Sequence, residues 1–314
     1  MIKILKKSNN QNNYLVTIAI GSKYLNKWKK YSYISWKKYC EKYNLGLIVV
    51  TKNLINKNDP NWKNANWQKL LIGSKLEDIK IKINNICYLD TDIIINNLSP
   101  NIFKFHDRNK FSVISKRFNM PFDSYSALMT KIALLRKKYL DRSYPLNSAL
   151  NMSIRDLYKF HNLKNQGNEF CSGVIVFNLK KFAKKMKSWF YKYGKNIKSV
   201  TGGEQTHFNY EVLNTKKINW LNYKFQAIWL YEMAYKYPFL YKTNSSKVIK
   251  YCIESSLYEN YFLHFAGKWP DSNMWNFSGK INYIFDKNYY KIFIKKKNFL
   301  KGRSKGILYP KLNK

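Results

Sequence analysis

Two apolar runs enclose a pair of carboxylates in the stretch Ile86-Cys87-Tyr88-Leu89-Asp90-Thr91-Asp92-Ile93-Ile94-Ile95. The first run has the length and composition of a buried strand, so Asp90 and Asp92 come where that strand ends. In extended geometry, residues i and i+2 leave the same face of a strand. Two neighbouring carboxylates repel each other unless they share a cation, and oxygen ligands suit Mg²⁺ or Mn²⁺. The stretch therefore predicts a divalent-cation site.

A second interpretation of the Asp90-Thr91-Asp92 triplet stays open. Asp side chains often accept hydrogen bonds from backbone N–H groups at the start of a helix or turn, so the pair could belong to a solvated loop. The buried strand before the pair and the apolar run after it favour the cation site. In an open α/β sheet the carboxyl ends of the strands border the ligand crevice, and the pair falls at such an end.

Strand-length apolar runs alternate with helix-length segments on both sides of this stretch. Strands are predicted at 14–20, 45–51, 85–89, 111–115 and 173–177. Helices are predicted at 24–43, 67–76, 127–139 and 179–193. Such alternation is typical of an α/β fold with a mostly parallel central sheet.

The size and composition of the chain suit a sizeable core, in one large domain or in two small ones, since 45% of its 314 residues are apolar. Its four cysteines lie far apart, which excludes a zinc ribbon or a dense disulfide framework and suits a reducing compartment. No apolar run reaches 18 residues, so no membrane-spanning helix is expected. A polar segment at 8–13 interrupts the basic start, unlike a signal peptide. These features favour a cytoplasmic protein.

The formal charge of +39 raises the possibility of nucleic-acid binding, because neutralisation of phosphates dominates such binding. However, 51 of the 57 basic residues are Lys and only 6 are Arg, the residue that pairs bidentately with phosphate and guanine. Lys, Asn, Ile, Tyr and Phe are abundant together, as A/T-rich codons would produce. We therefore do not expect nucleic acid as a partner, although a nucleic-acid-binding protein remains an alternative.

Three further segments carry polar residues next to apolar runs. Small residues precede a predicted strand in Cys171-Ser172-Gly173-Val174, and a carboxylate and an amide open a predicted helix in Gly203-Glu204-Gln205. An apolar stretch ends in His264-Phe265-Ala266-Gly267-Lys268. Taken alone, His264 also fits a hydrogen-bonded structural histidine, and Glu204 fits the first turn of an ordinary helix. The order of the segments along the chain is more specific than any one of them.

In that order the motifs resemble those of the GT-A glycosyltransferases, most closely the retaining family 8 enzymes of the glycogenin and lipopolysaccharide galactosyltransferase type. Asp90-Thr91-Asp92 matches their Asp-x-Asp, and Cys171-Ser172-Gly173-Val174 matches their Asn-(Ala/Ser)-Gly-Val. Glu204-Gln205 with Asn209 matches Asp-Gln-x-x-x-Asn, and the segment from His264 to Lys268 matches His-x-x-Gly…Lys. The departures are Cys171 for Asn, Glu204 for Asp, and a Lys-Trp-Pro order at 268–270.

The resemblance implies a GT-A (Rossmann-like) nucleotide-diphospho-sugar transferase fold. It also implies a cation, Mn²⁺ or Mg²⁺, that Asp90, Asp92 and His264 hold against the donor's two phosphates. Gln205 and Glu204 are the implied catalytic residues, which would stabilise positive charge at the anomeric carbon and position hydroxyls. The implied donor-binding residues are Gly21, Tyr24, Lys69, Ser172, Gly267 and Lys268.

The predicted organisation is a glycosyltransferase domain over 1–280 and a basic, aromatic tail over 281–314. Within the domain, the insertion 117–166 is long enough to form a lid on the acceptor side. The tail suits either an interfacial segment on an anionic membrane or a compositionally biased terminus. The protein is therefore expected to be cytoplasmic, with peripheral membrane contact through the tail as one alternative.

The predicted function is metal-dependent transfer of a sugar, as by a hexosyltransferase, from a nucleotide diphosphate sugar to an acceptor. The resemblance implies a UDP-linked donor, retention of configuration, and a saccharide, glycolipid or glycoprotein as acceptor. A sugar-1-phosphate nucleotidyltransferase is an alternative that also uses paired carboxylates and a metal. It would need a glycine-rich loop after the first predicted strand, where Gly21 is the single glycine.

Overall fold

The computed structural model describes residues 1–9, 11–79, 81–139, 151–197, 199–200, 203–243, 245–267 and 272–280. The segment Met1–Gly279 forms one compact unit. Two predicted features, Lys268 and the tail over 281–314, lie outside the described residues, as do positions 140–150 of the predicted insertion. None of the described helices is long and apolar enough to cross a bilayer.

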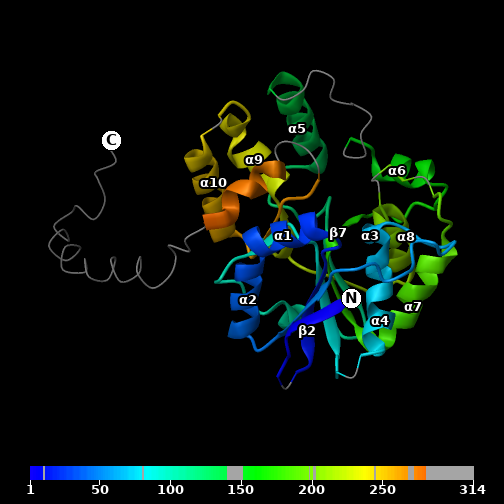
Figure 1. Cartoon of the computed structure of the whole chain (residues 1–314). Coiled ribbons are helices and arrows are strands. Elements are labelled where there is room, and N and C mark those ends of the chain that lie inside the picture. Colours follow the sequence, from blue (N-terminus) through cyan, green and yellow to red (C-terminus); the bar gives the residue numbers. More distant parts are fainter. Residues whose placement is uncertain are drawn as a thin grey trace, which may run out of the picture. The chain divides into compact units, whose positions relative to one another are not determined.

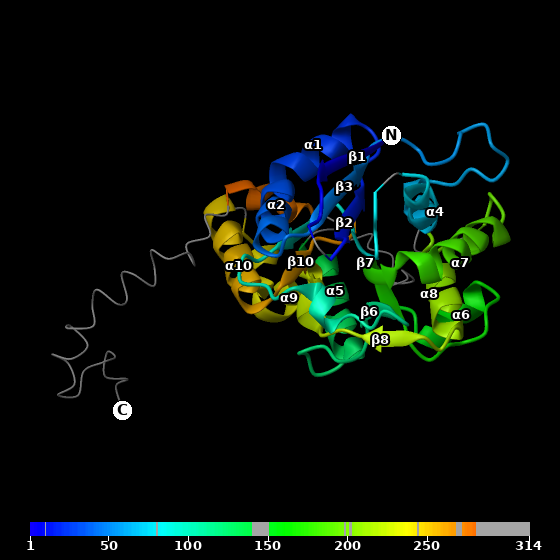
Figure 2. The same cartoon turned by 90° about the horizontal axis from the view of Figure 1, so that it is seen from below.

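A seven-stranded sheet forms the centre of this unit, in the order β1-β3-β2-β4-β7-β6-β8 (Figures 1 and 2). The strands β2, β3, β4, β6 and β8 share one direction, and β1 and β7 run against them. The prediction of an α/β fold with a mostly parallel central sheet is therefore confirmed, with β7 as an antiparallel strand inside it. The strands are β1 (Ile2–Lys6), β2 (Asn13–Ile18), β3 (Gly46–Val50), β4 (Asn85–Leu89), β6 (Phe111–Ser115), β7 (Phe170–Asn178) and β8 (Ile218–Trp220).

Helices cover both faces of the sheet, and alternate side chains of each central strand pack on opposite sides. On one face, Leu15 and Cys87 pack with Trp28 and Trp36 of α1 (Ser22–Tyr31) and α2 (Tyr33–Lys42). On the other face, Val16 packs among residues of α4 (Ile72–Glu77), α7 (Leu179–Lys192) and α8 (Gln205–Asn214). Figure 1 shows α1 and α2 on one side of the sheet and α4 and α7 on the other.

A small second sheet brings His264 next to the carboxylates of Asp90 and Asp92. Its order is β5 (Ile93–Ile95), β10 (Phe262–His264) and β9 (Ala227–Ile228). Strand β10 runs antiparallel to β5, and His264 pairs with Ile93. Since Ile93 directly follows Asp92, this register brings His264 to the acidic pair from a distant part of the chain.

Three predictions about the elements need correction. The predicted helix 24–43 is two helices, because the chain breaks at Ser32, whose hydroxyl donates to Thr91 O at 2.8 Å. The predicted helix 67–76 consists of α3 (Ala65–Gln68), the 3₁₀ turn η1 (Lys69–Leu71) and α4. Strand β1, in the basic start, is absent from the sequence prediction. Its half-buried residues Ile2, Ile4 and Lys6 alternate with the exposed Lys3 and Leu5, as on an edge strand.

The remaining elements include those of the predicted insertion 117–166. Within it, α5 (Tyr125–Tyr139) contains the predicted helix 127–139, and α6 (Ile154–Phe160) follows the gap at 140–150. The acceptor-side role of this insertion stays a prediction. The other described elements are η2 (Ile102–Phe105), η3 (Tyr223–Gln226), α9 (Trp229–Lys236), η4 (Pro238–Tyr241), α10 (Ser246–Glu259) and η5 (Ser272–Lys280).

Candidate functional site

The Asp90-Thr91-Asp92 triplet forms the connection between the two sheets. Strand β4 ends at Leu89 and β5 begins at Ile93, so the triplet is a turn and not the extended strand end that the sequence predicts. Its backbone is held on both sides, because Asp90 N–H donates to Gly173 O of β7 at 2.9 Å and Phe265 N–H donates to Asp92 O at 3.0 Å. The turn is therefore anchored to elements far away in the sequence.

The two carboxylates of this turn converge on one imidazole nitrogen. His264 Nε2 lies 3.2 Å from Asp92 Oδ1 and 3.8 Å from Asp90 Oδ2. One ligand atom from each residue lies within 4.8 Å of the others. Two carboxylate oxygens and one imidazole nitrogen at this spacing match the donor set that Mn²⁺ accepts, and Mg²⁺ also takes carboxylates. The residues present therefore fit a divalent cation.

A buried lysine joins the acidic pair to the start of α8. Lys69 Nζ lies 2.8 Å from Glu204 Oε1 and 3.5 Å from Asp90 Oδ1. It also donates to Ser172 O at 3.2 Å and to Ser172 Oγ at 3.3 Å. Burial lowers the pKa of Lys69, but Asp90 and Glu204 raise it more, and the net shift is upward. Its ammonium group is therefore charged. We call Asp90, Asp92, Glu204, Lys69 and His264 the acidic cluster.

The charges of the acidic cluster shift two further pKa values. Burial raises the pKa of Asp90, but Lys69, His264 and the hydroxyl of Tyr88 lower it further, so the net shift is downward. The Tyr88 hydroxyl donates to Asp90 Oδ1 at 2.7 Å. For His264, burial lowers the pKa and Asp92 raises it to well above its ordinary value. Without a cation, the imidazole is therefore protonated between two carboxylates.

The predicted catalytic pair sits at the start of α8, and its two members have different partners. Glu204 is the N-terminal flanking residue of α8, and its Oε1 accepts from the Ser172 hydroxyl at 2.7 Å as well as from Lys69. Gln205 contacts a second group of charges, because its Nε2 donates to Glu169 Oε1 at 2.9 Å. The structure therefore joins Glu204 directly to the acidic cluster, whereas the amide of Gln205 is oriented by Glu169.

Glu169 lies between two cations directly before β7. Its Oε2 accepts from Arg117 Nε at 2.9 Å, and its Oε1 lies 3.3 Å from Lys116 Nζ. Burial raises the pKa of Glu169, but Lys116 and Arg117 lower it further. We call Glu169, Lys116, Arg117 and Gln205 the Glu169 cluster. Sequence reasoning missed its first three members, and the one available signal was a carboxylate beside the predicted strand 173–177.

The predicted donor-binding residues fall into two groups. Lys69 belongs to the acidic cluster, and Ser172 hydrogen-bonds to its members Lys69 and Glu204. Gly21 and Gly267 lie at bends near the strand ends, and Tyr24 lies in the first turn of α1. Gly21 has a φ of +87° and precedes α1, a conformation that favours glycine, and Tyr24 is 56% exposed on α1. Gly267, with a φ of +101°, comes three residues after His264. A donor-binding role for this second group stays a prediction.

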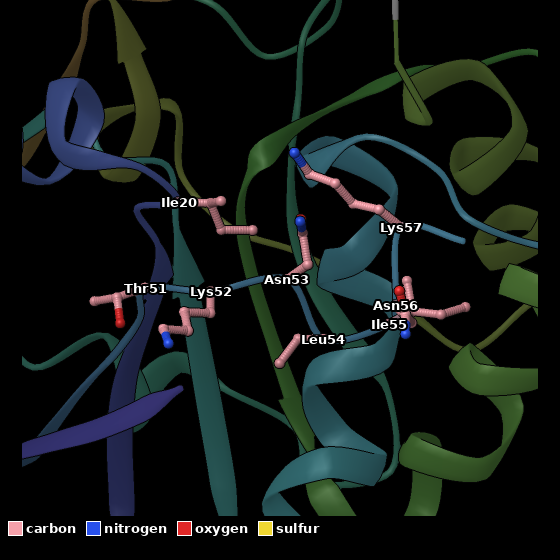
Figure 3. Close-up of a pocket in the computed structure, with 8 residues that line it drawn as sticks. All are labelled: Ile20, Thr51, Lys52, Asn53, Leu54, Ile55, Asn56 and Lys57. Carbon is pink, nitrogen blue, oxygen red and sulfur yellow. The ribbon is translucent and has the colours of Figure 1, made fainter. Parts of the chain in front are cut away.

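An open cavity of about 490 Å³ lies where β2 and β3 end (Figure 3). In Figure 3 the side chains of Ile20, Asn53 and Lys57 point toward one another around it. Its lining residues are Ile20, Thr51, Lys52, Asn53, Leu54, Ile55, Asn56 and Lys57.

The cavity is tied to the acidic cluster through Gln68, the residue before Lys69. Gln68 is fully buried, and its Oε1 accepts from Leu54 N–H at 2.7 Å while its Nε2 donates to Asn53 Oδ1 at 3.0 Å. Two consecutive buried residues thus connect the sites: Gln68 hydrogen-bonds to the cavity wall, and Lys69 contacts Asp90.

Comparison with known proteins gives likenesses of structure alone. No protein-family model and no curated protein matches the chain. Among solved structures, it is similar to a glycosyltransferase involved in the glycosylation of the major capsid of PBCV-1, with 9% identity and a TM-score of 0.47 over 84% of this chain and 98% of that one. It is similar to the galactosyltransferase LgtC, solved with donor and acceptor sugar analogs, with 13% identity and a TM-score of 0.41 over 86% and 96%.

A third similar structure, the bifunctional glycosyltransferase WbbM, shows 12% identity and a TM-score of 0.45 over 91% of this chain. The chain spans about half of WbbM, 52% of its length. All three similar proteins are glycosyltransferases by description. At these identities and TM-scores the likenesses establish nothing about activity, which has to be inferred from the site itself.

Proposed function

We propose that this chain is a metal-dependent glycosyltransferase that moves a sugar from a nucleotide diphosphate sugar to a saccharide, glycolipid or glycoprotein acceptor. The observation that carries the proposal is the convergence of Asp90, Asp92 and His264, beside the Lys69–Glu204 ion pair, where strands of an α/β sheet end. This is the edge at which such sheets bind ligands. The order of the motifs along the chain gives the proposal its reaction class.

The metal would be held by Asp90, Asp92 and His264. An imidazole ligand suits Mn²⁺ better than Mg²⁺, so Mn²⁺ is the preferred ion of the proposal. When bound, such a cation supplies positive charge that stabilises a diphosphate leaving group without transferring a proton. Lys69 adds a second positive charge, 3.5 Å from Asp90.

The nucleoside of the donor would occupy the cavity where β2 and β3 end. Its volume of about 490 Å³ lies in the range of small-molecule sites, and Lys52 and Lys57 add positive charge for an anionic ligand. Gly21 and Tyr24 follow Ile20 in the chain and so lie at the same strand end. A UDP-linked donor is the choice that the motif resemblance favours.

Glu204 and Gln205 would position the transferred sugar and stabilise positive charge at its anomeric carbon. Glu204 Oε1 already accepts hydrogen bonds from Lys69 and from the Ser172 hydroxyl, which hold the carboxylate in place. Gln205 donates its amide N–H to Glu169, so its carbonyl oxygen is the end left to face a developing oxocarbenium ion. Neither residue is needed as a general base if a donor phosphate oxygen takes the acceptor's proton, as in a reaction with retention.

A thermal-shift panel of nucleotide sugars, with and without Mn²⁺, tests this proposal. A ligand that binds only the folded state raises its stability, so at least one nucleotide sugar should raise Tm, and only when Mn²⁺ is present. Asp92→Asn should abolish that shift. Asp107→Asn is the matched control, because the Asp107 carboxylate is half-buried outside the acidic cluster and binds Lys110. If no nucleotide sugar shifts Tm with Mn²⁺ or Mg²⁺, the proposal is wrong.

A further inference from the structure

The ring of His264 is enclosed on the side away from the carboxylates. Gln226, the last residue of η3, is 1% exposed, and its amide lies 3.2 Å from His264 Nδ1. The thiol of Cys171 also lies on this side, with Sγ 3.8 Å from Nδ1. The two ring nitrogens of His264 thus face different environments: Nε2 faces the carboxylates and Nδ1 faces Gln226.

Two backbone groups determine which way the Gln226 amide points. The N–H of Val174 can only donate, and it faces one end of the amide at 3.1 Å. The carbonyl oxygen of Cys171 can only accept, and it faces the other end at 3.1 Å. Both are satisfied when Oε1 lies next to Val174 N and Nε2 lies next to Cys171 O. In that orientation, Oε1 is the atom 3.2 Å from His264 Nδ1.

The orientation of the Gln226 amide determines which ring nitrogen of His264 carries a hydrogen. An oxygen acceptor at 3.2 Å requires that Nδ1 carry the hydrogen and donate it, whether or not Nε2 is also protonated. In a neutral imidazole only one nitrogen carries hydrogen, so Nε2 then has the free lone pair. That lone pair is directed at the gap shared with Asp92 Oδ1 and Asp90 Oδ2.

Gly173 of β7 supplies a second, independent indication that this arrangement is built into the fold. A Cβ atom at Gly173 would overlap His264 Cε1 and would lie 2.8 Å from a terminal atom of the Gln226 amide. Both approaches are closer than real Cβ contacts. Only glycine therefore lets the imidazole and the amide lie together against β7.

We propose that Gln226 is the positioning residue for His264: it accepts the Nδ1 hydrogen, fixes the plane of the ring, and so strengthens binding of a divalent cation at Nε2. This rests on the proposed function, because it concerns the cation which that function requires. Hydrogen-bond partners that orient a metal-binding histidine typically contribute 10- to 100-fold to metal affinity.

Titration with Mn²⁺, alone and in the presence of UDP, tests the role of Gln226, with free Mn²⁺ measured by electron paramagnetic resonance. Gln226→Met has a similar size and replaces the amide oxygen by a thioether, which is only a weak acceptor, and we expect it to weaken Mn²⁺ binding by about 10- to 100-fold. Gln226→Glu keeps an oxygen at Nδ1, and we expect it to retain most of the wild-type affinity. If Gln226→Met does not fold, Gln226→Asn, whose shorter side chain does not reach Nδ1, replaces it.

A buried amide at the other end of β4 provides the matched control. Asn85 is 3% exposed and hydrogen-bonds Asn13 at 2.9 Å and Asn178 at 3.1 Å. Asn85→Leu should lower Tm in the presence of a chelator, as Gln226→Met does, but leave Mn²⁺ affinity unchanged. This separates loss of stability from loss of the ring's orientation.

The outcomes distinguish this inference from the proposed function. If wild type and Gln226→Met bind Mn²⁺ equally tightly, or if Gln226→Glu is as weak as Gln226→Met, the role of Gln226 is wrong and the metal site stands. If the wild-type protein binds no Mn²⁺ with or without UDP, the metal-dependent function is wrong and the inference falls with it.

Discussion

The acidic cluster and the Glu169 cluster lie at the same strand, β7, but are built for different purposes. In the acidic cluster, three carboxylates share one lysine and one histidine, and the side chains of Asp90 and Asp92 are 32% and 25% exposed. In the Glu169 cluster, one carboxylate that is 1% exposed is enclosed by Lys116, Arg117 and Gln205. The first has negative charge to spare and an open side, as a cation site needs. In the second, the single carboxylate is already paired with two cations and is closed off from solvent, as an orienting support needs.

Removing one carboxylate from the acidic cluster should have the largest effect. Asp92→Asn leaves the imidazole and one carboxylate as metal ligands. We expect it to reduce the rate of sugar transfer by about 10³-fold, since a metal ion supplies several kcal/mol of charge stabilisation and each 1.36 kcal/mol is a factor of about ten. Initial rates with a radiolabelled donor at saturating Mn²⁺ measure this. Unchanged turnover would mean that Asp92 is not a ligand.

The corresponding change in the closed cluster should act on stability instead. Glu169→Gln leaves Lys116 and Arg117 buried without a counter-charge, which we expect to lower the free energy of unfolding by about 3 kcal/mol. Urea denaturation measures this, and Mn²⁺ affinity measured on the folded variant should equal that of the wild type. A variant that keeps its stability but loses Mn²⁺ would reverse the roles of the two clusters.

The local features of the site could be predicted from the sequence. Asp90 and Asp92 stand out because a buried strand precedes them, and Glu204 stands out because it opens a predicted helix next to the amide of Gln205. Residues that act through long-range pairing could not be predicted in this way. Tyr88 reads as one more apolar strand residue, yet its hydroxyl binds Asp90, and Gln226 reads as a loop residue, yet it binds His264 across 38 positions.

The same difference between local features and long-range pairing explains the errors in the predicted helices and strands. The segment 24–43 is predicted as one helix because nothing in its local pattern marks a break. The break falls at Ser32, whose hydroxyl bonds to a carbonyl 59 positions away. The triplet Asp90-Thr91-Asp92 is predicted to be extended. In the structure the chain turns there, because β4 belongs to the large sheet and β5 pairs with β10 in the small one. Strand order and register are decided by partners that a single segment does not contain.

Metal affinity at the acidic cluster should increase as the pH rises. The folded-state pKa of His264 is raised by Asp92, so the metal-free imidazole is protonated at neutral pH. A cation must displace that proton, and we expect Mn²⁺ affinity to rise about tenfold per pH unit until the pH reaches that pKa. Conversely, the stability that protonated His264 gives the metal-free protein is present below about pH 6.5 and is lost as the pH rises through the raised pKa.

Mn²⁺ titrations between about pH 6 and 8 check this dependence, with His264→Asn as the control. The variant should show a weaker affinity and a flat profile over that range. A wild-type affinity that does not change with pH would contradict the protonated imidazole and show that the metal displaces no proton from His264.

The smallest effect on transfer is expected from the tail over 281–314. A chain that ends at Asp286 lacks the ten basic residues of the final 28 positions. It should turn over a soluble donor as the full chain does, but bind less to vesicles of anionic phospholipid than the full chain. Co-sedimentation with the vesicles measures the binding. Equal sedimentation of the two chains would remove the membrane role proposed for the tail.

Diffraction from crystals grown with Mn²⁺, recorded on both sides of the manganese absorption edge, tests the acidic cluster most directly. We predict one strong anomalous peak within about 2.3 Å of Asp90, Asp92 and His264 Nε2, with Nδ1 still bound to Gln226. A map without a peak there, or with manganese bound elsewhere while His264 remains paired to Asp92, would contradict a cation site at the turn between β4 and β5.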